Sequence, residues 1–565
     1  MRLTPFLIPL FATSVVGQLN ASDDPAKNHG KRPNIVFILT DDQDVHLHSM
    51  DYLPLIKKHL RDQGTSFTNH YCTVNVTDVS PPYGGYPKFI SQGLNDNHLP
   101  VWLQSHGYNT YYTGKLFNYH DITNYNSPYV NGFTSSDFLL DPYTYNYENP
   151  AFQHNKDAPI LHNGTYSTDL VANKTFAFLE EATKAEKPFF LVAAPIAPHS
   201  NGRPPFTVPI SADRHKDLFK DVRVPRTANF NPSVPSGASW VKRLSQQNES
   251  VVEYNDEFYR LRLRSLQAVD ELVDGVFERL ERLGLLENTY VIYSSDNGFH
   301  IGQHRLQPGK TCAYEEDINV PLIIRGPGVS RNRTTNLVTT HTDLSPTILH
   351  LTGAAPRPDF DGSPIPIHGS EIDSFVSSKD KVREHVNVEF WGLGIGEGTF
   401  AGAKVQNNTY KSVRVIGGEG KGAYSLSYTV WCEGDHELYN VLVDPGQMVN
   451  LLAANSTAER LIPGLGSVAR VTARLDALLL VLKSCKGSSC RRPWASLHPN
   501  GGVQTLGDAM AERFDAFYVE KQAKVGFSRC ELGYLIDAEG AQFENDGEVY
   551  RDLMMRDGAE WSEWV

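Results

Sequence analysis

The segment Pro33–Asp44, PNIVFILTDDQD, decides the fold class. Its apolar run Asn34–Leu39 is rich in β-branched and aromatic residues and stops abruptly at Thr40–Asp42. A second run of the same design, Thr289–Tyr293, stops at Ser294–Gly298. Short continuous apolar runs of this kind are typical of parallel strands that are covered on both faces. We therefore expect both segments to be central strands of one sheet.

Helices are predicted between these strands. Apolar residues recur at steps of three and four in the segment that leads into the second strand, at Leu263, Leu266, Val269, Leu272, Val273, Val276, Leu280 and Leu283. This spacing predicts an amphipathic helix that ends at Gly284. Phe189–Val192 and Val320–Ile324 are expected to be further strands, and Ser345 is expected to cap a helix with Pro346 as its first residue. Strands that alternate with helices predict an α/β fold, a mostly parallel sheet with helices on both faces.

The chain divides into three parts on this basis. Residues 1–17 are expected to be a signal peptide, because Arg2 is followed by the apolar run Leu3–Val16 and the small residue Gly17. Residues 32–377 hold the strand–helix alternation and form the larger domain. From about residue 378 the pattern changes to Gly- and Tyr-rich pieces such as 408–415 and 423–430, which predict a smaller C-terminal α+β domain.

Several features agree with a secreted, extracellular protein. Eight N-x-[ST] sequons are candidate glycosylation sites, at Asn20, Asn75, Asn163, Asn173, Asn248, Asn332, Asn407 and Asn455. The six cysteines are even in number, as in proteins of oxidising compartments. Cys485 and Cys490 are close enough for a small loop disulfide, whereas the other pairings stay open. No apolar run reaches the roughly 20 residues of a membrane span.

The composition excludes one class of partner. The chain has 565 residues, of which 40% are hydrophobic, so it can bury an extensive core. Its net charge of −13 argues against nucleic acid, whose phosphates require a basic face. A small anion is still an acceptable ligand where a metal ion and a few lysines meet in one place.

Acidic side chains follow both central strands. Asp41 and Asp42 end the first strand, and Asp296 and Asn297 end the second. Ligands of open α/β sheets bind beyond the carboxyl ends of the strands. Three carboxylates that meet there would repel one another without a cation, and hard oxygen donors favour calcium or magnesium. The alternative is that both pairs are ordinary caps and turns.

Three basic side chains are expected beside the same sheet edge. Lys115 ends a strand in a glycine–lysine turn, His199 follows the strand Phe189–Val192, and Lys310 lies in a loop after Asp296. Each residue alone is more often a solvated charge or a structural histidine. Together, beside a divalent cation, they would form a pocket for a tetrahedral anion.

These segments resemble the sulfatases, especially the arylsulfatase and N-acetylglucosamine-6-sulfatase branch, with fungal arylsulfatases looking closest. The matching stretches are PNIVFILTDDQD from Pro33, GYNTYYTGKLFN from Gly107, PIAPHS from Pro195, SSDNGFHIGQH from Ser294, KTCAYEEDINVPLIIRGPG from Lys310 and HELYNVLVDPGQMVNLL from His436. The resemblance implies an alkaline-phosphatase-like fold, calcium bound by Asp41, Asp42, Asp296 and Asn297, and a small sulfated substrate held by Lys115, His199 and Lys310. It implies a catalytic role for the same three residues. It also places Asn118 where other sulfatases carry a histidine, and so adds Asn118 to the substrate-binding residues.

The sequence departs from the family at the nucleophile. Sulfatases convert the cysteine or serine of a C/S-x-P-x-R motif into formylglycine, and that motif should follow Phe67–Cys72. Here Val74 and Val76 stand where Cys72 would need the proline and the arginine, and no other C-x-P-S-R or S-x-P-S-R occurs. We expect Cys72 to be a buried or disulfide-bonded cysteine. A segment on the order of twenty residues, a turn and a helix, is absent. The sequence on both sides of the junction still resembles the family. A skipped exon or a wrongly assigned intron therefore explains the loss better than gradual decay of an enzyme.

The leading hypothesis is a secreted sulfuric ester hydrolase by lineage, which cleaves aryl or sugar sulfates with calcium and formylglycine, although this 565-residue chain should be inactive. Two alternatives remain: a calcium-containing pseudoenzyme that binds sulfated ligands, and a phosphoester or phosphonate hydrolase of the same superfamily. A two-metal phosphatase would need extra ligands, for which His300 and His304 are the spare candidates. The sequence does not predict the physiological substrate, the pH optimum or the oligomeric state.

Overall fold

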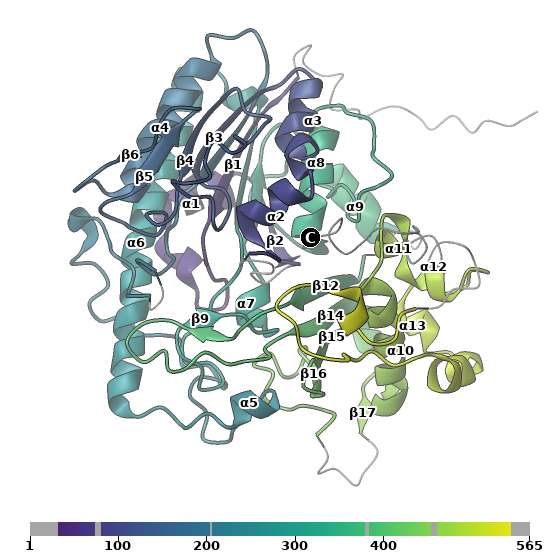
Figure 1. Ribbon diagram of the computed structural model, residues 1–565. Coiled ribbons are helices and arrows are strands. Elements are labelled where there is room, and N and C mark those ends of the chain that lie inside the picture. Colours follow the sequence, from purple (N-terminus) through teal and green to yellow (C-terminus); the bar gives the residue numbers. More distant parts are fainter. Residues whose placement is uncertain (1–31, 74–80, 204–205, 379–382, 454–459, 544–565) are drawn as a thin grey trace, which may run out of the picture.

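The computed structural model describes residues 32–73, 81–203, 206–378, 383–453 and 460–543. The predicted signal peptide, the sequons at Asn20, Asn75 and Asn455, and the junction after Thr73 lie outside these ranges. Two layered units are visible, a large sheet with helices on both faces and a smaller sheet with its own helices (Figure 1).

A ten-stranded sheet organises the larger domain. The strands follow one another across it in the order β11 (Arg333–Thr340), β2 (Thr65–Tyr71), β10 (Leu322–Arg325), β8 (Thr289–Ser295), β1 (Asn34–Thr40), β7 (Phe189–Ala194), β3 (Asn109–Lys115), β4 (Ser135–Leu139), β5 (Ala151–His154) and β6 (Ile160–Leu161). Strands β8, β1, β7, β3 and β4 are parallel, whereas β10 runs antiparallel to both of its neighbours. The α/β prediction of a mostly parallel sheet is confirmed.

Successive residues of β1 face the two helical layers. Val36 and Ile38 pack in the core under α1 (Pro54–Ile56), α4 (Ser167–Ala182) and α6 (Glu249–Arg282). Ile35 packs on the other face, whose helices are α2 (Gly85–Ser91), α3 (Leu99–Ser105), α8 (Leu344–Leu351) and α9 (Gly369–Ser377). Burial on both faces explains why the strand reads as a continuous apolar run.

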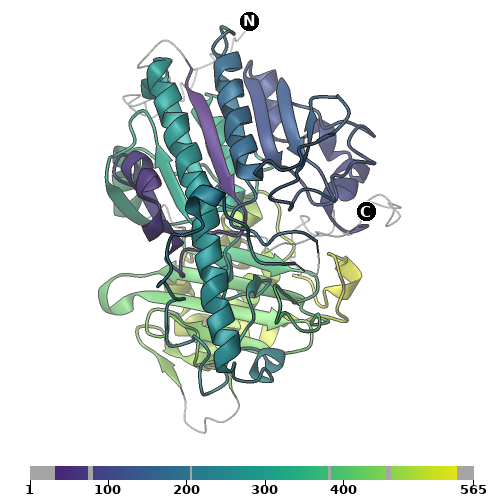
Figure 2. The same cartoon turned by 90° about the vertical axis from the view of Figure 1, so that its left-hand side faces the viewer.

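Helix α6 is much longer than the apolar pattern at its C-terminal half suggested. It begins at Glu249, with the Asn248 side chain accepting a hydrogen bond from the Val251 amide, and Gly284 follows its end with a φ of 67°. The helix runs along the length of the molecule (Figure 2). Of the described helices, none is long and apolar enough to cross a membrane.

The expected cap of helix α8 is wrong. Ser345 lies inside the helix, and the start is instead fixed by Thr340 and Asp343 around the 3-10 turn His341–Asp343. The Thr340 amide donates to the Asp343 carboxylate at 2.9 Å, which satisfies a terminal N–H group that Ser345 is too far along the chain to reach.

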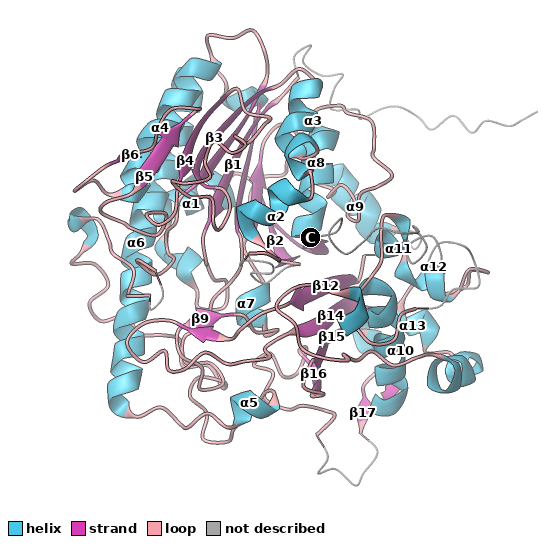
Figure 3. Ribbon diagram, in the orientation of Figure 1, coloured by secondary structure: helices cyan, strands magenta, loops and turns pink. Residues whose placement is uncertain are grey.

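The smaller domain contains a four-stranded antiparallel sheet, β12 (His385–Phe390), β14 (Tyr410–Gly417), β15 (Tyr424–Trp431) and β16 (His436–Asn440). Helices α10 (Val468–Leu482), α11 (Ser488–Arg491), α12 (Pro493–Leu497) and α13 (Leu506–Ala509) lie beside it (Figure 3). Its α+β character agrees with the prediction. The predicted boundary at residue 378 falls between α9 and β12.

The cysteines divide into paired and free ones. Cys485 and Cys490 form the expected small-loop disulfide, and Cys432 is bonded to Cys530. Cys72 and Cys312 are buried free thiols. Cys432–Cys530 joins the end of β15 to the last described segment of the chain, and so ties that segment to the small sheet.

Glu384 gives the smaller domain a predictable pH dependence. Its carboxylate is 2% exposed and accepts hydrogen bonds from the Tyr424 hydroxyl, the Trp494 indole and the Leu506 amide. Burial outweighs these bonds and raises the pKa of Glu384 to about 7. The folded protein therefore binds a proton between pH 4.5 and 7 that the unfolded chain has released.

We expect this proton to stabilise the fold at low pH. Its contribution is complete below the unfolded pKa and falls by about 1.4 kcal/mol per pH unit as pH rises through the folded pKa. Glu384→Gln should therefore lose less stability than the unmodified protein between pH 5 and pH 8. Denaturant unfolding of both proteins at these two pH values measures the difference, and equal pH slopes would contradict the prediction.

Candidate functional site

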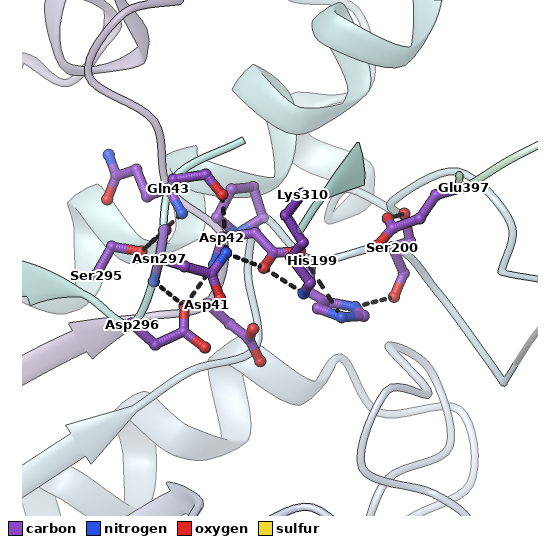
Figure 4. Close-up of polar contacts among 12 residues, drawn as sticks. Asp41, Asp42, Gln43, His199, Ser200, Ser295, Asp296, Asn297, Lys310 and Glu397 are labelled. Carbon is purple, nitrogen blue, oxygen red and sulfur yellow. Dashed lines mark hydrogen bonds and ion pairs between the residues drawn. The ribbon is translucent and has the colours of Figure 1, made fainter. Parts of the chain in front are cut away.

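The carboxylates predicted from the strand ends lie together. Strands β1 and β8 are in register, with Thr40 opposite Ser295, so the residues that follow them emerge side by side. The Asp42 amide donates to Asp296 Oδ1 at 2.9 Å, and Asn297 Nδ2 donates to Asp42 Oδ1 at 2.8 Å (Figure 4). Parallel strands thus bring four oxygen-bearing side chains from two distant segments to one sheet edge.

Two lysines neutralise these carboxylates. Lys115 Nζ lies 2.7 Å from Asp41 Oδ2 and 3.6 Å from Asp296 Oδ2. Lys310 Nζ lies 2.5 Å from Asp42 Oδ1. Burial alone would lower the pKa of each lysine, but the neighbouring Asp41 and Asp42 carboxylates outweigh it and hold both pKa values above the usual range. Both lysines are therefore charged, as anion binding requires.

A glycine is needed to bring Lys115 to this position. Gly114 precedes it in β3 with a φ of 112°, a conformation that side-chain-bearing residues rarely adopt. A Cβ at this position would lie 2.0 Å from the carbonyl oxygen of Ala194 in the neighbouring strand. Steric exclusion of any side chain at position 114 therefore explains why a glycine precedes Lys115.

His199 faces the same cluster as a neutral ring. Its Nδ1 is 2.8 Å from the carbonyl oxygen of Ser200, and a carbonyl only accepts, so Nδ1 carries the hydrogen. Burial, with the nearby Lys310 charge, lowers the pKa of His199 to about 4. The unprotonated Nε2 then lies 3.7 Å from Asp42 Oδ2.

The donor set fits a divalent cation. Asp41 Oδ1 and Asp42 Oδ2 are buried, and neither has a hydrogen-bond partner among the described residues. Ligand atoms of Asp41, Asp42 and His199 lie within 4.8 Å of one another. Buried oxygens without partners are costly in free energy. A hard cation such as calcium would satisfy them, because it prefers carboxylate oxygens as ligands. Burial would raise the pKa of Asp42, yet Lys310 and His199 hold it below its usual range, so this carboxylate is ionised.

A second group of metal-binding residue types has less need of an ion. His300 Nδ1 is 2.7 Å from Asp317 Oδ1, and the Cys312 amide donates to Asp317 Oδ2 at 2.8 Å. Both carboxylate oxygens are thus satisfied by protein groups. His304, the other spare histidine, bonds the Ser236 hydroxyl through Nδ1 at 2.8 Å. The contacts of His300 and His304 therefore give no support to a two-metal site.

Asn118 is linked to the cluster through another side chain. Its Oδ1 accepts a hydrogen bond of 2.8 Å from the hydroxyl of Tyr145. The Tyr145 ring stacks on His199 with centroids 4.1 Å apart, and Lys115 Nζ lies 5.1 Å from the same ring. Asn118 therefore orients a tyrosine that contacts two of the predicted anion ligands.

Arg262 is a buried residue of the site that sequence reasoning missed. It lies in α6, donates to the backbone carbonyl of Asp42, and is 3.3 Å from Asp44 Oδ1. Its guanidinium also lies 3.9 Å from the ring centroid of Phe299. One sequence feature could have identified Arg262: it lies next to Leu263 in the apolar stripe of the helix. An arginine is tolerated at such a place only with buried partners.

Cys72 is unsuited to act as a nucleophile. The thiol is fully buried, and burial, together with the Asp296 and Asp317 carboxylates, raises its pKa well above the usual value. Its Sγ lies 3.6 Å from the carbonyl oxygen of Asp317. A protonated, enclosed thiol agrees with the expectation of a buried cysteine, since the reactive form is the thiolate.

The sheet, its helical layers and the small antiparallel domain together are an alkaline-phosphatase-like fold. The chain belongs to the sulfatase family, whose model matches residues 33–354. It is 37% identical over 534 residues to an arylsulfatase of Volvox carteri, which covers 86% of this chain and 80% of that protein. The sulfatase ppz1 of Metarhizium majus is 42% identical over 404 residues, with 71% and 85% covered.

A solved structure shows the same fold. It aligns with a TM-score of 0.59 and 20% identity, and covers 75% of this chain and 94% of the other. That protein was solved in complex with its substrate D-glucosamine-2-N,6-O-disulfate.

Proposed function

We propose that this chain binds sulfate monoesters of aryl alcohols or sugars at the carboxyl ends of β1 and β8, with calcium held by Asp41, Asp42, Asp296 and Asn297. The observation that carries the proposal is the pair of buried oxygens Asp41 Oδ1 and Asp42 Oδ2, which have no hydrogen-bond partner in the described ranges and lie beside two charged lysines. Calcium, when bound, would polarise the ester oxygens. The family, with its relatives named arylsulfatase and N-acetylglucosamine-6-sulfatase, supports the choice of sulfate esters.

The basic residues hold the sulfate group in this proposal. Lys115, beside Asp41 and Asp296, and Lys310, beside Asp42, supply charged donors. His199 turns Nε2 toward Asp42 because Nδ1–H is bonded to the carbonyl of Ser200. In the neutral ring Nε2 carries no hydrogen, so it donates to an ester oxygen once it has taken up a proton. Tyr145, held by Asn118, stacks on the His199 ring and lies beside Lys115.

Binding is proposed without turnover. The lineage is that of a sulfuric ester hydrolase, but the sequence contains no formylglycine motif and the Cys72 thiol is protonated and enclosed. The chain is thus a sulfate-binding protein that retains the anion site of an enzyme. Secretion is part of the proposal: the described sequon residues Asn163, Asn173, Asn248, Asn332 and Asn407 are all exposed, and two disulfides are present. A Sulf-1 homologue of Caenorhabditis elegans, described by name as extracellular, is 31% identical over 373 residues.

Calcium titration tests the metal part of this proposal. We expect one calcium ion to bind the secreted chain, and Asp42→Asn to weaken binding at least about tenfold, since even indirect partners of metal ligands contribute that much. Asp213→Asn is the matched control, because the Asp213 side chain is fully exposed. Isothermal titration calorimetry of the three proteins, without and with 4-nitrophenyl sulfate, gives both affinities. Equal calcium affinity in all three would contradict the assignment.

A further inference from the structure

We propose that Glu397, in the smaller domain, is a positioning residue that fixes the orientation of His199 through Ser200. The inference rests on the proposed sulfate site and deepens it, because it makes a loop of the smaller domain part of that site. Glu397 lies far from every motif in the sequence, yet its carboxylate is 2% exposed beside the cluster (Figure 4).

The backbone of this loop is clamped against the Lys310 segment. Strand β13 (Ile395–Gly396) pairs antiparallel with β9 (Gly309–Lys310), so that Ile395 lies opposite Lys310. The Glu397 amide then donates to the carbonyl of Pro308 at 2.7 Å. A loop of the smaller domain therefore pairs with the larger-domain strand that carries Lys310, and the same loop supplies the buried carboxylate of Glu397.

A chain of hydrogen bonds connects Glu397 to the His199 ring. The Ser200 hydroxyl, which is fully buried, donates to Glu397 Oε2. The carbonyl of Ser200 in turn accepts from His199 Nδ1 at 2.8 Å. A further bond of 2.8 Å from the Tyr147 hydroxyl holds the His199 carbonyl. With Nδ1 occupied in this way, Nε2 is directed at Asp42, where the sulfate site is proposed.

The described residues form no close ion pair with Glu397, so burying its carboxylate is costly, which argues that it has a role. Lys310 forms its ion pair with Asp42, and the hydrogen bond from Ser200 is the side-chain contact that the described residues give to Glu397. Desolvation of a carboxylate is costly unless hydrogen bonds or charges compensate. The charge of Glu397 acts on both Lys310 and His199, which places it within electrostatic reach of the anion ligands.

Four variants of the full chain separate positioning from other effects. Glu397→Ala removes the carboxylate, Ser200→Ala removes only the link, and Glu397→Gln keeps an acceptor for Ser200 while it removes the charge. Glu419→Ala is the control, because Glu419 is an exposed residue of the same domain. Thermal unfolding verifies that each variant is folded.

The first readout is the tautomer of His199, from nitrogen-15 spectra of histidine-labelled protein assigned with His199→Gln. We expect the Nδ1–H form alone in the unmodified chain, Glu397→Gln and Glu419→Ala, and a mixture of both tautomers in Glu397→Ala and Ser200→Ala. The second readout is the affinity for 4-nitrophenyl sulfate in calcium buffer. It should fall about tenfold in Glu397→Ala and Ser200→Ala, and stay within about twofold in Glu397→Gln.

Two results would overturn the assignment. One is an unchanged tautomer in folded Glu397→Ala and Ser200→Ala. The other is a loss in Glu397→Gln equal to that in Glu397→Ala, which would make charge rather than the hydrogen bond the cause. Failure of the unmodified chain to bind the ester would refute the proposed function alone, because the tautomer is read without any ligand.

Discussion

The 565-residue chain should show no hydrolysis of an aryl sulfate above background, even with calcium supplied. A C-x-P-S-R turn and its following helix, inserted between Cys72 and Asn75 in a host that makes formylglycine, should produce activity. The reason lies in the chemistry of the nucleophile. A sulfated formylglycine hydrate expels sulfate as its second hydroxyl forms the aldehyde, and water then adds to restore the hydrate. An ordinary hydroxyl needs an activating base and a separate hydrolysis step. Thr73 hydrogen-bonds the hydroxyl of Thr342 at 3.2 Å and has no base in that contact.

Both forms must be shown to fold and to be secreted before they are assayed with a chromogenic aryl sulfate. The same insert with alanine at the motif's cysteine controls for restored packing without a nucleophile. Turnover by the unmodified chain that survives purification would refute the claim and would indicate a nucleophile outside the family's motif. A stable, folded and silent short form would favour the ligand-binding pseudoenzyme over an error in exon assignment.

Loss of either lysine should be the largest point-mutation effect on the restored enzyme. Lys115→Ala or Lys310→Ala should lower turnover by about two orders of magnitude or more, the scale for loss of a preorganised charge stabiliser. Each ammonium is 2.7 Å or less from a buried carboxylate of the cluster, so its removal also leaves that carboxylate with less compensation. Steady-state kinetics of the restored form measure the effect.

Lys57→Ala is the matched control for the lysine variants. Lys57 forms an exposed ion pair with Asp62, and such pairs contribute little. Its kinetics should equal those of the restored form. Unchanged turnover in both Lys115→Ala and Lys310→Ala would contradict the prediction and would show that the two lysines act only as structural ion-pair partners.

The parts of the site that follow strands were predictable from the sequence, because their signal is local. The runs that end at Asp41 and at Asp296 are apolar on both faces, and parallel register then forces their ends together. Gly114 and Lys115 were recognisable for a similar reason, since a close approach of strands demands the glycine.

The remaining features depend on tertiary contacts that leave little local trace. Glu397 reaches the cluster because β13 pairs with a loop from the other domain, and nothing around it in the sequence marks that pairing. Ser345 was a plausible helix cap by residue type. The capping residues are instead Thr340 and Asp343, at the turn that precedes the helix. Residue type therefore predicts strand ends better than it predicts contacts between domains.

A crystal structure of the unmodified chain with calcium and an intact aryl sulfate tests the central claim most directly. A chain that binds without turnover should hold the whole ester. The account predicts calcium with Asp41 Oδ1 and Asp42 Oδ2 among its ligands, at about 2.3–2.6 Å. It also predicts the sulfate group within hydrogen-bond reach of Lys115, His199 and Lys310. Calcium at another place, or an ester on a different surface with this cluster unchanged, would contradict it.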